Sequence, residues 1–550
     1  MAGSNSLIAR NREGTRRRTW LLWAGTALAL LLASLFLGWV STRFVNIEGW
    51  LSMLGGLVLG GGILLLGWTA LKADRKIELP HSLAWLVVGA ALLRLTAGAF
   101  WFVALPAWGY GSPVEQAGYI MADAEARDTA AWQLANSGEP LWTAFRDFRL
   151  ADQYGGLLFT SALVYRYLGG DLHQPLQMVV LSASFSALAV ALVYAFARRA
   201  WEARVAWIAA WILALFPEAV LLGSSQMREA FTITLAAAAF YGLVRSHQDR
   251  TGSGLAWIAG SLILCLVLSP PFAVVLLVML TVQALSLNHW RALRQPRFWM
   301  LIGVMAIIAA AGIWLSWSRI APEGIDNPVA LIGWWLKQSA KWQATVARRA
   351  SGWLQRIFRT MPGWSQIPFL LLYGIAQPFL PAAILQSSIP LWRGIAIWRA
   401  LGWTALLVLL AFATLRAWAR HGRGELASGL ALVAWGGILL ASLRSGGDLW
   451  DNPRYRTAFA GLQAALVAWA WVEQQRRPNP WLRRLAVSAG LVLAWFLPWY
   501  LRRYTPIPWM VVDLFKTVGL GLASAVLYGI WDWARRAPSH PSNTDAGSSP

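Results

Sequence analysis

The stretch PLQMVVLSASFSALAVALVYAFA, residues 175–197, decides the fold class. It contains no charged residue, and about 20 apolar residues in a helix are enough to cross the ~30 Å hydrocarbon core of a bilayer. Similar apolar blocks recur along the whole chain between short charged segments. The sequence therefore predicts an all-α, polytopic membrane protein.

The apolar blocks and the charged residues between them predict about fourteen transmembrane helices. The expected spans are residues 20–40, 51–71, 83–105, 175–197, 203–223, 226–245, 255–270, 272–288, 298–318, 400–416, 426–443, 457–473, 482–501 and 507–531. The first is interpreted as a membrane span rather than a cleavable signal peptide, because a second long span follows at once.

The composition agrees with this fold class. Of the 550 residues, 57% are hydrophobic and 13% are charged, and the mean hydropathy is +0.50, whereas soluble chains are about 45–50% apolar and about 25% charged. The lipid bilayer is therefore the expected partner of the protein. Despite the net charge of +22, a nucleic-acid partner is not expected. Cys265 is the single cysteine, which excludes an intramolecular disulfide.

The distribution of arginines predicts a cytoplasmic location for both termini of a protein in the cytoplasmic (inner) membrane, since positive residues favour cytoplasmic loops. The predicted organisation is a basic cytoplasmic N-terminus (1–19), two additional transmembrane helices (20–80), a core (83–475), two C-terminal transmembrane helices (482–533) and a disordered tail (537–550).

Two long segments of the core are expected outside the membrane, at residues 106–174 and 319–399. The first is acidic and ends in an apolar stretch, 154–168, that predicts a helix at the interface. The second contains Lys337 and Lys341 on one face of a basic amphipathic helix. Such a helix would bind either anionic lipid headgroups or a lipid-linked phosphate.

Charged motifs follow one another in a distinctive order along the core. The motifs are ALLRL with a central Arg94, ADAEARD with Asp123, Glu125 and Asp128, PE at 217–218, SSQMRE with Arg228 and Glu229, and DNPRYR with Arg454, Tyr455 and Arg456. These motifs also have purely structural interpretations. The acidic motif could be a hydrated loop, and the arginines could form ion pairs with nearby acids such as Asp451 or Glu218. Arg94, at mid-depth in a span, requires a partner or a wet cavity.

This order of motifs over residues 83–475 resembles the GT-C class of membrane glycosyltransferases, specifically bacterial relatives of the protein O-mannosyltransferase and aminoarabinose transferase families. Residues 123–134 follow the family's acidic pattern D-A-x-x-Y-D-x-x-A-x-x-L. Arg127 stands where those relatives have tyrosine, which puts in doubt any acceptor contact that the aromatic ring would make.

The resemblance implies inverting transfer of a sugar from a polyprenyl-phosphate-linked donor to a protein, lipid or glycan acceptor, at the extracytoplasmic face. Asp123 would be the general base, with Glu125 and Asp128 as the other acids of the catalytic motif. The donor phosphate would bind to Arg454, Arg456 and Arg228, and to Lys337 and Lys341; Arg94, Glu229 and Tyr455 would orient the site.

Other assignments stay open. No cofactor is expected, although the three acids of 123–128 could bind a divalent metal, as they do in oligosaccharyltransferases. A lipid-linked sugar flippase or transporter would place more charges inside its spans, where Arg94 is one of few. An O-antigen polymerase or ligase would not need the early acidic motif.

Overall fold

The computed structural model describes residues 24–535 except for short internal gaps. The gaps are residues 149, 250–251, 288–293, 316, 318–320, 323, 328, 332, 335–351, 387, 420–424, 445–450 and 506–512. Every regular element in the described part is a helix, which confirms the predicted all-α class. Lys337, Lys341 and most of the predicted amphipathic helix lie outside the described residues.

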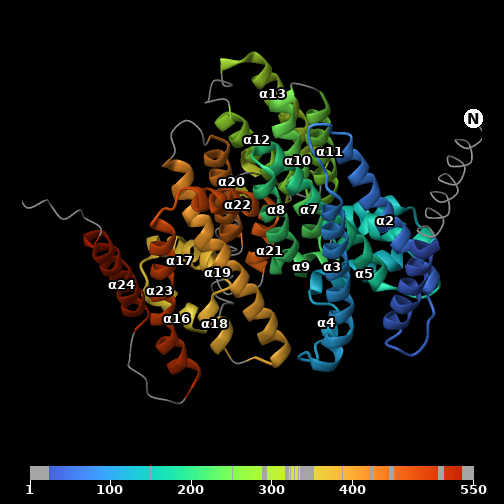
Figure 1. Ribbon diagram of the computed structural model, residues 1–550. Coiled ribbons are helices and arrows are strands. Elements are labelled where there is room, and N and C mark those ends of the chain that lie inside the picture. The colour runs from blue at the N-terminus through green and yellow to red at the C-terminus, as the bar shows by residue number, and fades with distance from the viewer. Residues whose placement is uncertain are drawn as a thin grey trace, which may run out of the picture. The chain divides into compact units, whose positions relative to one another are not determined.

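The helices follow one another along the whole chain (Figure 1). They are Ala24–Ser41, α2 (Trp50–Lys72), α3 (His81–Trp108), α4 (Pro113–Gln116), α5 (Ala122–Asn136), η1 (Leu141–Phe145), α6 (Gly156–Leu168), α7 (Pro175–Ala200), α8 (Ala203–Leu215), α9 (Pro217–Gly223), α10 (Arg228–Asp249), α11 (Gly252–Leu268), α12 (Pro270–Leu287), α13 (Pro296–Leu315), α16 (Gly352–Thr360), α17 (Gly363–Ala376), α18 (Leu380–Leu385), α19 (Pro390–Trp418), α20 (Glu425–Arg444), α21 (Asp451–Thr457), α22 (Ala460–Arg476), α23 (Trp481–Tyr504) and α24 (Leu514–Ala534).

Each of the fourteen predicted spans corresponds to a helix or, for 203–223, to the pair α8 and α9. Among the described residues, nine helices are long and apolar enough to cross a membrane, or ten if that bent pair is one span. Fewer helices than the predicted fourteen meet this criterion, and two of them show why. Helix α11 is only 17 residues long, and α10 carries charges in its first and last turns. The multi-pass character is confirmed, and the number of fourteen spans stays a prediction.

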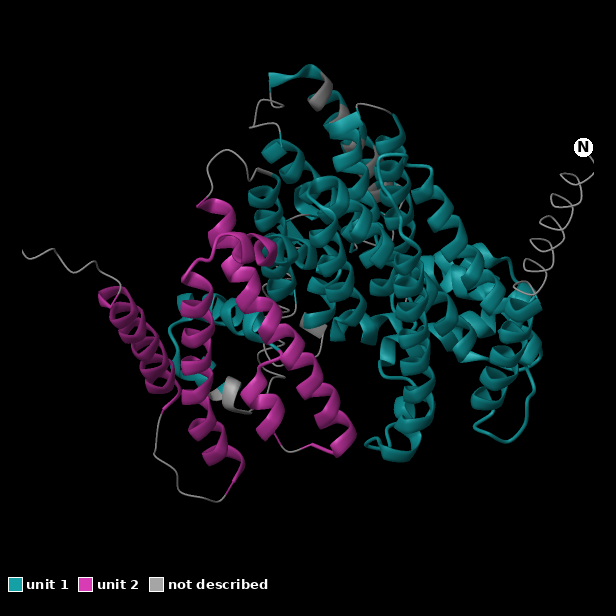
Figure 2. Cartoon of the chain, in the orientation of Figure 1, with its two compact units in different colours: residues 1–377, 420–469 teal, residues 378–419, 470–550 magenta. Residues whose placement is uncertain are grey.

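The chain forms two compact units (Figure 2). Unit 1 contains residues 1–377 and 420–469, and unit 2 contains residues 378–419 and 470–550. This division differs from the predicted core of 83–475, because α19 groups with the C-terminal helices. In unit 2, Asp532 of α24 accepts hydrogen bonds from Arg483 and Arg484 of α23, the latter at 2.7 Å.

Helix α7 is the centre of unit 1, and nearly all of its residues are buried. It packs against α2, α3, α8 and α10, which surround it in Figure 1. The sequence permits this because serine and alanine recur along 182–191, and small residues let helix backbones approach closely in a membrane. The stretch that predicts the fold class is therefore also the core of the fold.

Arg94 of α3 is fully buried beside the break between α8 and α9, which are bent by 57°. Pro217 begins α9 and has no N–H to donate to the carbonyl of Leu213, four residues earlier. The Arg94 guanidinium donates instead to the carbonyl oxygens of Leu213 and Ala214, both at 3.3 Å. Arg94 thus caps a helix end, a position that favours a cation.

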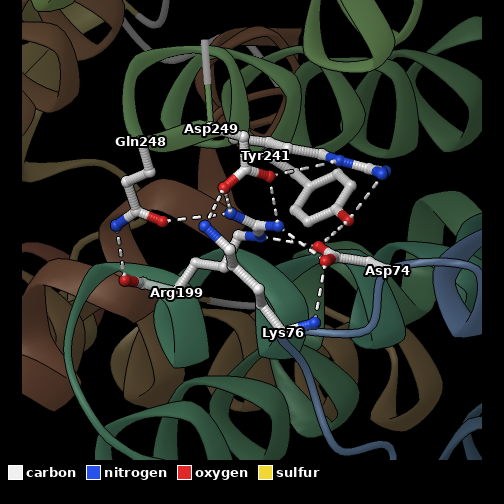
Figure 3. Close-up of polar contacts among 7 residues, drawn as sticks. Asp74, Lys76, Arg199, Tyr241, Gln248 and Asp249 are labelled. Atoms are coloured by element: carbon white, nitrogen blue, oxygen red, sulfur yellow. Dashed lines mark hydrogen bonds and ion pairs between the residues drawn. The ribbon is translucent and has the colours of Figure 1, made fainter. Parts of the chain in front are cut away.

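An ion-pair cluster around the buried Arg199 and Asp74 joins the loop after α2 to the C-terminal parts of α7 and α10 (Figure 3). We call it the anchor cluster; it consists of Asp74, Lys76, Arg199, Tyr241, Gln248 and Asp249. Arg199 donates two hydrogen bonds of 2.6 Å to Asp74, and further bonds of 2.8 and 3.2 Å to Asp249. Tyr241 donates to Asp74 and Lys76 donates to Asp249, each at 2.6 Å.

Candidate functional site

The first predicted site residue, Asp123, forms an ion pair with the predicted phosphate ligand Arg454. Arg454 Nη1 lies 2.8 Å from Asp123 Oδ2, although the two residues are 331 positions apart. Asp123 lies in the first turn of α5, where a carboxylate is favoured by the helix dipole, and Arg454 lies in the short helix α21. The Asp123 side chain is 51% exposed and the Arg454 side chain 8%, so the carboxylate is the accessible partner.

The surrounding charges determine the protonation state of Asp123. Partial burial is the largest single effect and raises the pKa of its carboxyl group, but the charge and hydrogen bond of Arg454 and the charges of Arg127 and Arg228 together lower it. The net pKa is below the ordinary value for aspartate. Asp123 is therefore ionised at neutral pH and able to accept a proton.

Glu229 and Tyr455, both predicted to orient the site, lie against Arg454. Glu229 Oε1 is 3.7 Å from Arg454 Nε, and the Tyr455 hydroxyl accepts a 3.0 Å hydrogen bond from Arg454 Nη2. The other carboxylate oxygen of Glu229, Oε2, is buried and has no hydrogen-bond partner among the described residues. A buried carboxylate oxygen without a donor is costly, which indicates that the site has capacity for a bound hydroxyl or cation.

Asp152 is a site residue that the sequence analysis missed. Its side chain is fully buried and accepts backbone hydrogen bonds from Tyr154 and Leu158. It lies 3.6 Å from Arg127 and 4.0 Å from Arg228. The one feature of the sequence that could have indicated Asp152 is its position at the end of the acidic part of segment 106–174. Asp152 is therefore the common anionic neighbour of Arg127 and Arg228, as Asp123 is of Arg454.

Arg127 and Arg228 complete this group. Arg127, which stands where the families that the sequence resembles have tyrosine, is buried and donates a 3.0 Å hydrogen bond to the carbonyl of Gln226. Arg228 begins α10, its guanidinium lies 4.9 Å from the centre of the Tyr154 ring, and its side chain keeps 19% exposure. We call Asp123, Arg127, Asp152, Arg228, Glu229 and Arg454 the site cluster.

Asp128, predicted with the catalytic acids, lies in a different environment. Its carboxylate is fully buried and is bound by the hydroxyls of Tyr119 and Tyr165, each at 2.6 Å, and by His173 Nε2 at 2.8 Å. Burial and the Asp128 charge raise the pKa of both tyrosines. These contacts favour a structural role for Asp128, because each of its oxygens already has a donor.

The remaining predicted residues are spread around the cluster. Glu125 Oε1 is 3.4 Å from the hydroxyl of Thr129. Arg456 is buried and its Nη1 lies 3.5 Å from the carbonyl of Gly374 in α17, so it points to a different partner from Arg454. Within the described residues, no group of three or more His, Cys, Asp or Glu side chains is arranged to hold a metal ion.

In this all-α membrane protein, three carboxylates and three guanidinium groups therefore meet in one cluster, and Asp123 is the accessible carboxylate of the three. Residues 163–317 match the model of the family described as dolichyl-phosphate-mannose-protein mannosyltransferase. The match confirms, over that part of the chain, the resemblance that the motifs predicted. No curated protein matches the sequence.

Several structures of an archaeal enzyme are among the solved structures similar to this chain. One is the oligosaccharyltransferase AglB from Archaeoglobus fulgidus in complex with an inhibitory peptide and a dolichol-phosphate, with 14% identity, 85% coverage of this chain, 61% of that chain and a TM-score of 0.36. Another is the Archaeoglobus fulgidus oligosaccharyltransferase in complex with Zn and sulfate, with 16% identity, coverage of 82% and 56%, and a TM-score of 0.39. This chain thus spans less than two thirds of the length of those enzymes.

Proposed function

We propose that this chain is an integral membrane glycosyltransferase. It transfers a sugar from a polyprenyl-phosphate-linked donor to a hydroxyl of a protein, lipid or glycan acceptor at the extracytoplasmic face. The observation that carries the proposal is the 2.8 Å pair between the half-exposed Asp123 and the buried Arg454. This pair joins the early acidic motif to the late arginine motif, and the family match over 163–317 supports the same class of reaction.

Asp123 is the proposed general base. An acceptor hydroxyl is a weak nucleophile, and a carboxylate that removes its proton during attack contributes roughly 10²–10⁴-fold to the rate. The hydroxyl oxygen forms a bond to the anomeric carbon while the bond from that carbon to the phosphate oxygen breaks. The proton goes to Asp123, and the electron pair leaves with the polyprenyl phosphate, so the anomeric configuration inverts.

Arg454 and Arg228 are the proposed ligands of the leaving phosphate. Arg228 lies 4.0 Å from Asp152, longer than the 2.7–3.2 Å of an ordinary hydrogen bond, so its donors can turn to a phosphate. The planar guanidinium donates two charge-assisted hydrogen bonds to phosphate oxygens. Arg456 and the lysines at 337 and 341 stay predicted phosphate ligands of the same donor.

Donor binding and base strength are coupled in this arrangement. The charge of Arg454 lowers the pKa of Asp123, and a donor phosphate would share that charge. Asp123 then becomes a stronger base when the donor is present, because part of the cation's attraction goes to the phosphate. The enzyme would thereby avoid activating a hydroxyl in the absence of a donor.

The test is Asp123→Asn in cells that lack the native copy, with mass spectrometry of polyprenyl-linked sugars and of glycosylated products. We expect cells with the variant to accumulate one polyprenyl-phosphate sugar, and the transfer rate of the variant to be at least 10²-fold lower than that of the native protein. The matched control is Asp147→Asn, an exposed acid of the same segment outside the site cluster. Transfer by Asp123→Asn at the native rate would reject the proposed base, and transport of intact donor without transfer would favour a flippase.

A further inference from the structure

A cavity of about 510 Å³ lies between α7, α10 and α11 in unit 1. Its volume falls in the range of about 300–1,000 Å³ that ligand sites occupy. The lining is almost entirely apolar and includes Phe185, Leu188 and Leu264, and Arg245 is its charged member. Gly260 of α11 is an exposed residue of this lining, and a Cβ atom added there would meet open space. The cavity is therefore open to the bilayer side of α11.

The cavity has the length of one membrane leaflet. Along α10 it extends from Arg245 to Thr234, which corresponds to roughly 16 Å at 1.5 Å per residue. This is about half of the ~30 Å hydrocarbon core. An apolar groove of that length with a cation at one end matches a lipid acyl chain and its headgroup.

Arg245 is the cation in excess beside the anchor cluster. The two carboxylates, Asp74 and Asp249, make hydrogen bonds of 2.6–3.2 Å to Arg199, and Asp249 also pairs with Lys76. Arg245 is held more loosely: its Nε lies 3.9 Å from Asp249 and has no hydrogen-bond partner among the described residues, and its Nη1 donates a long hydrogen bond of 3.4 Å to the Tyr241 hydroxyl. In this group three cations therefore face two carboxylates, and the loosely held cation, Arg245, is the one that lines the groove.

The groove lies toward the end of α10 opposite the site cluster. Helix α10 begins with Arg228 and Glu229 of the site cluster and ends at Asp249. Its 22 residues span roughly 33 Å, the thickness of the hydrocarbon core. Arg245 lies 17 residues after Arg228 on α10, roughly 25 Å along the helix axis, so the cavity is far from the site cluster.

We propose that this groove binds an anionic glycerophospholipid, with one acyl chain along α7, α10 and α11 and the phosphate at Arg245. Basic pockets between transmembrane helices are recognised sites for anionic headgroups. The bound lipid fills the cavity and neutralises the surplus charge beside the anchor cluster. This site is independent of the proposed transfer reaction.

The test is native mass spectrometry of the purified full-length protein with phosphatidylglycerol and with phosphatidylcholine of the same acyl chains. We expect one phosphatidylglycerol to be retained in preference to phosphatidylcholine. Arg245→Gln should weaken phosphatidylglycerol binding about fivefold, the equivalent of ~1 kcal/mol for one basic residue. Gly260→Trp should reduce the binding of both lipids, because its ring competes for the groove without removing a charge.

The controls are Arg198→Gln, a neighbouring cation of α7 that does not line the cavity, and Gly490→Trp, another glycine with open space on α23. Both should bind phosphatidylglycerol as the native protein does. Equal retention of the two lipids, or unchanged phosphatidylglycerol binding in both Arg245→Gln and Gly260→Trp, would overturn the proposal. Selective retention of a polyprenyl phosphate instead would also overturn it.

Discussion

The two ends of α10 carry ion clusters of similar composition and opposite design. In the anchor cluster, Arg199 makes two 2.6 Å hydrogen bonds to Asp74. In the site cluster, one pair is short, Asp123 with Arg454 at 2.8 Å, while the other ion pairs are 3.6, 3.7 and 4.0 Å long. Charges satisfied by one another stabilise a fold, whereas charges held near one another but incompletely bonded are available to a ligand.

This comparison predicts that stability and activity depend on different ends of the helix. Asp74→Asn should lower the free energy of unfolding by about 3 kcal/mol, because removing one partner of a buried pair costs about 3–5 kcal/mol and Arg199 keeps Asp249. Asp123→Asn should cost less, because the Asp123 carboxylate is half-exposed and the buried Arg454 keeps Glu229 at 3.7 Å. Denaturant titration of both variants in the same detergent measures the difference. Equal losses would show that the site cluster is also structural.

Asp152→Asn tests whether the loosely paired arginines need a common anion. Asp152 lies near both Arg127 and Arg228, so its loss should misplace Arg228 and raise the KM for the lipid-linked donor about tenfold, the effect expected when Arg228 loses one charge-assisted hydrogen bond to the donor phosphate. The kcat should change less, because Asp123 and Arg454 stay in place. Asp147→Asn should leave KM unchanged. A variant with normal KM and reduced kcat would assign Asp152 to the chemical step instead.

The pH profile of kcat/KM provides a finer test of the short pair. The pKa of Asp123 is lowered by Arg454, so activity should be lost on the acid side only below the ordinary aspartate range of about 3.9. Arg454→Gln removes that attraction and leaves the effect of burial, which raises the pKa. The acid limb should therefore move to higher pH in this variant. An unmoved limb would mean that another group is the base.

The helices of this fold could be predicted from sequence because each one is encoded by a local block of apolar residues. Apolar blocks such as 175–197 predicted helices correctly, because membrane thickness fixes their length. The bend at Pro217 could also have been expected, and with it a use for Arg94, but the meeting of these two segments depends on packing across α3 and α8. The number of spans was less predictable, because short or charged helices such as α10 and α11 do not meet a simple criterion of length and hydropathy.

The site was predicted as individual residues and not as pairs. The motifs pointed to Asp123 and Arg454 separately, and no local pattern joins residues 331 positions apart. Asp128 and Arg456 belong to the same motifs, yet their side chains contact Tyr119 and Gly374, because neighbours on a helix project in different directions. Asp152 was missed since it stands outside any motif.

The smallest expected effect concerns the exposed edge of the anchor cluster. Lys76 pairs with Asp249 at 2.6 Å, but its side chain is 63% exposed, so Lys76→Gln should cost at most about 1 kcal/mol and less at high salt. The bonds from Arg199 and Lys76 lower the pKa of Asp249 to about 2. Its stabilising effect should thus be present above the ordinary aspartate pKa and be lost as the pH falls towards 2. Unfolding measured from pH 5 to pH 2 should show a shallower loss in Lys76→Gln, and an unchanged slope would assign the lowered pKa to Arg199 alone.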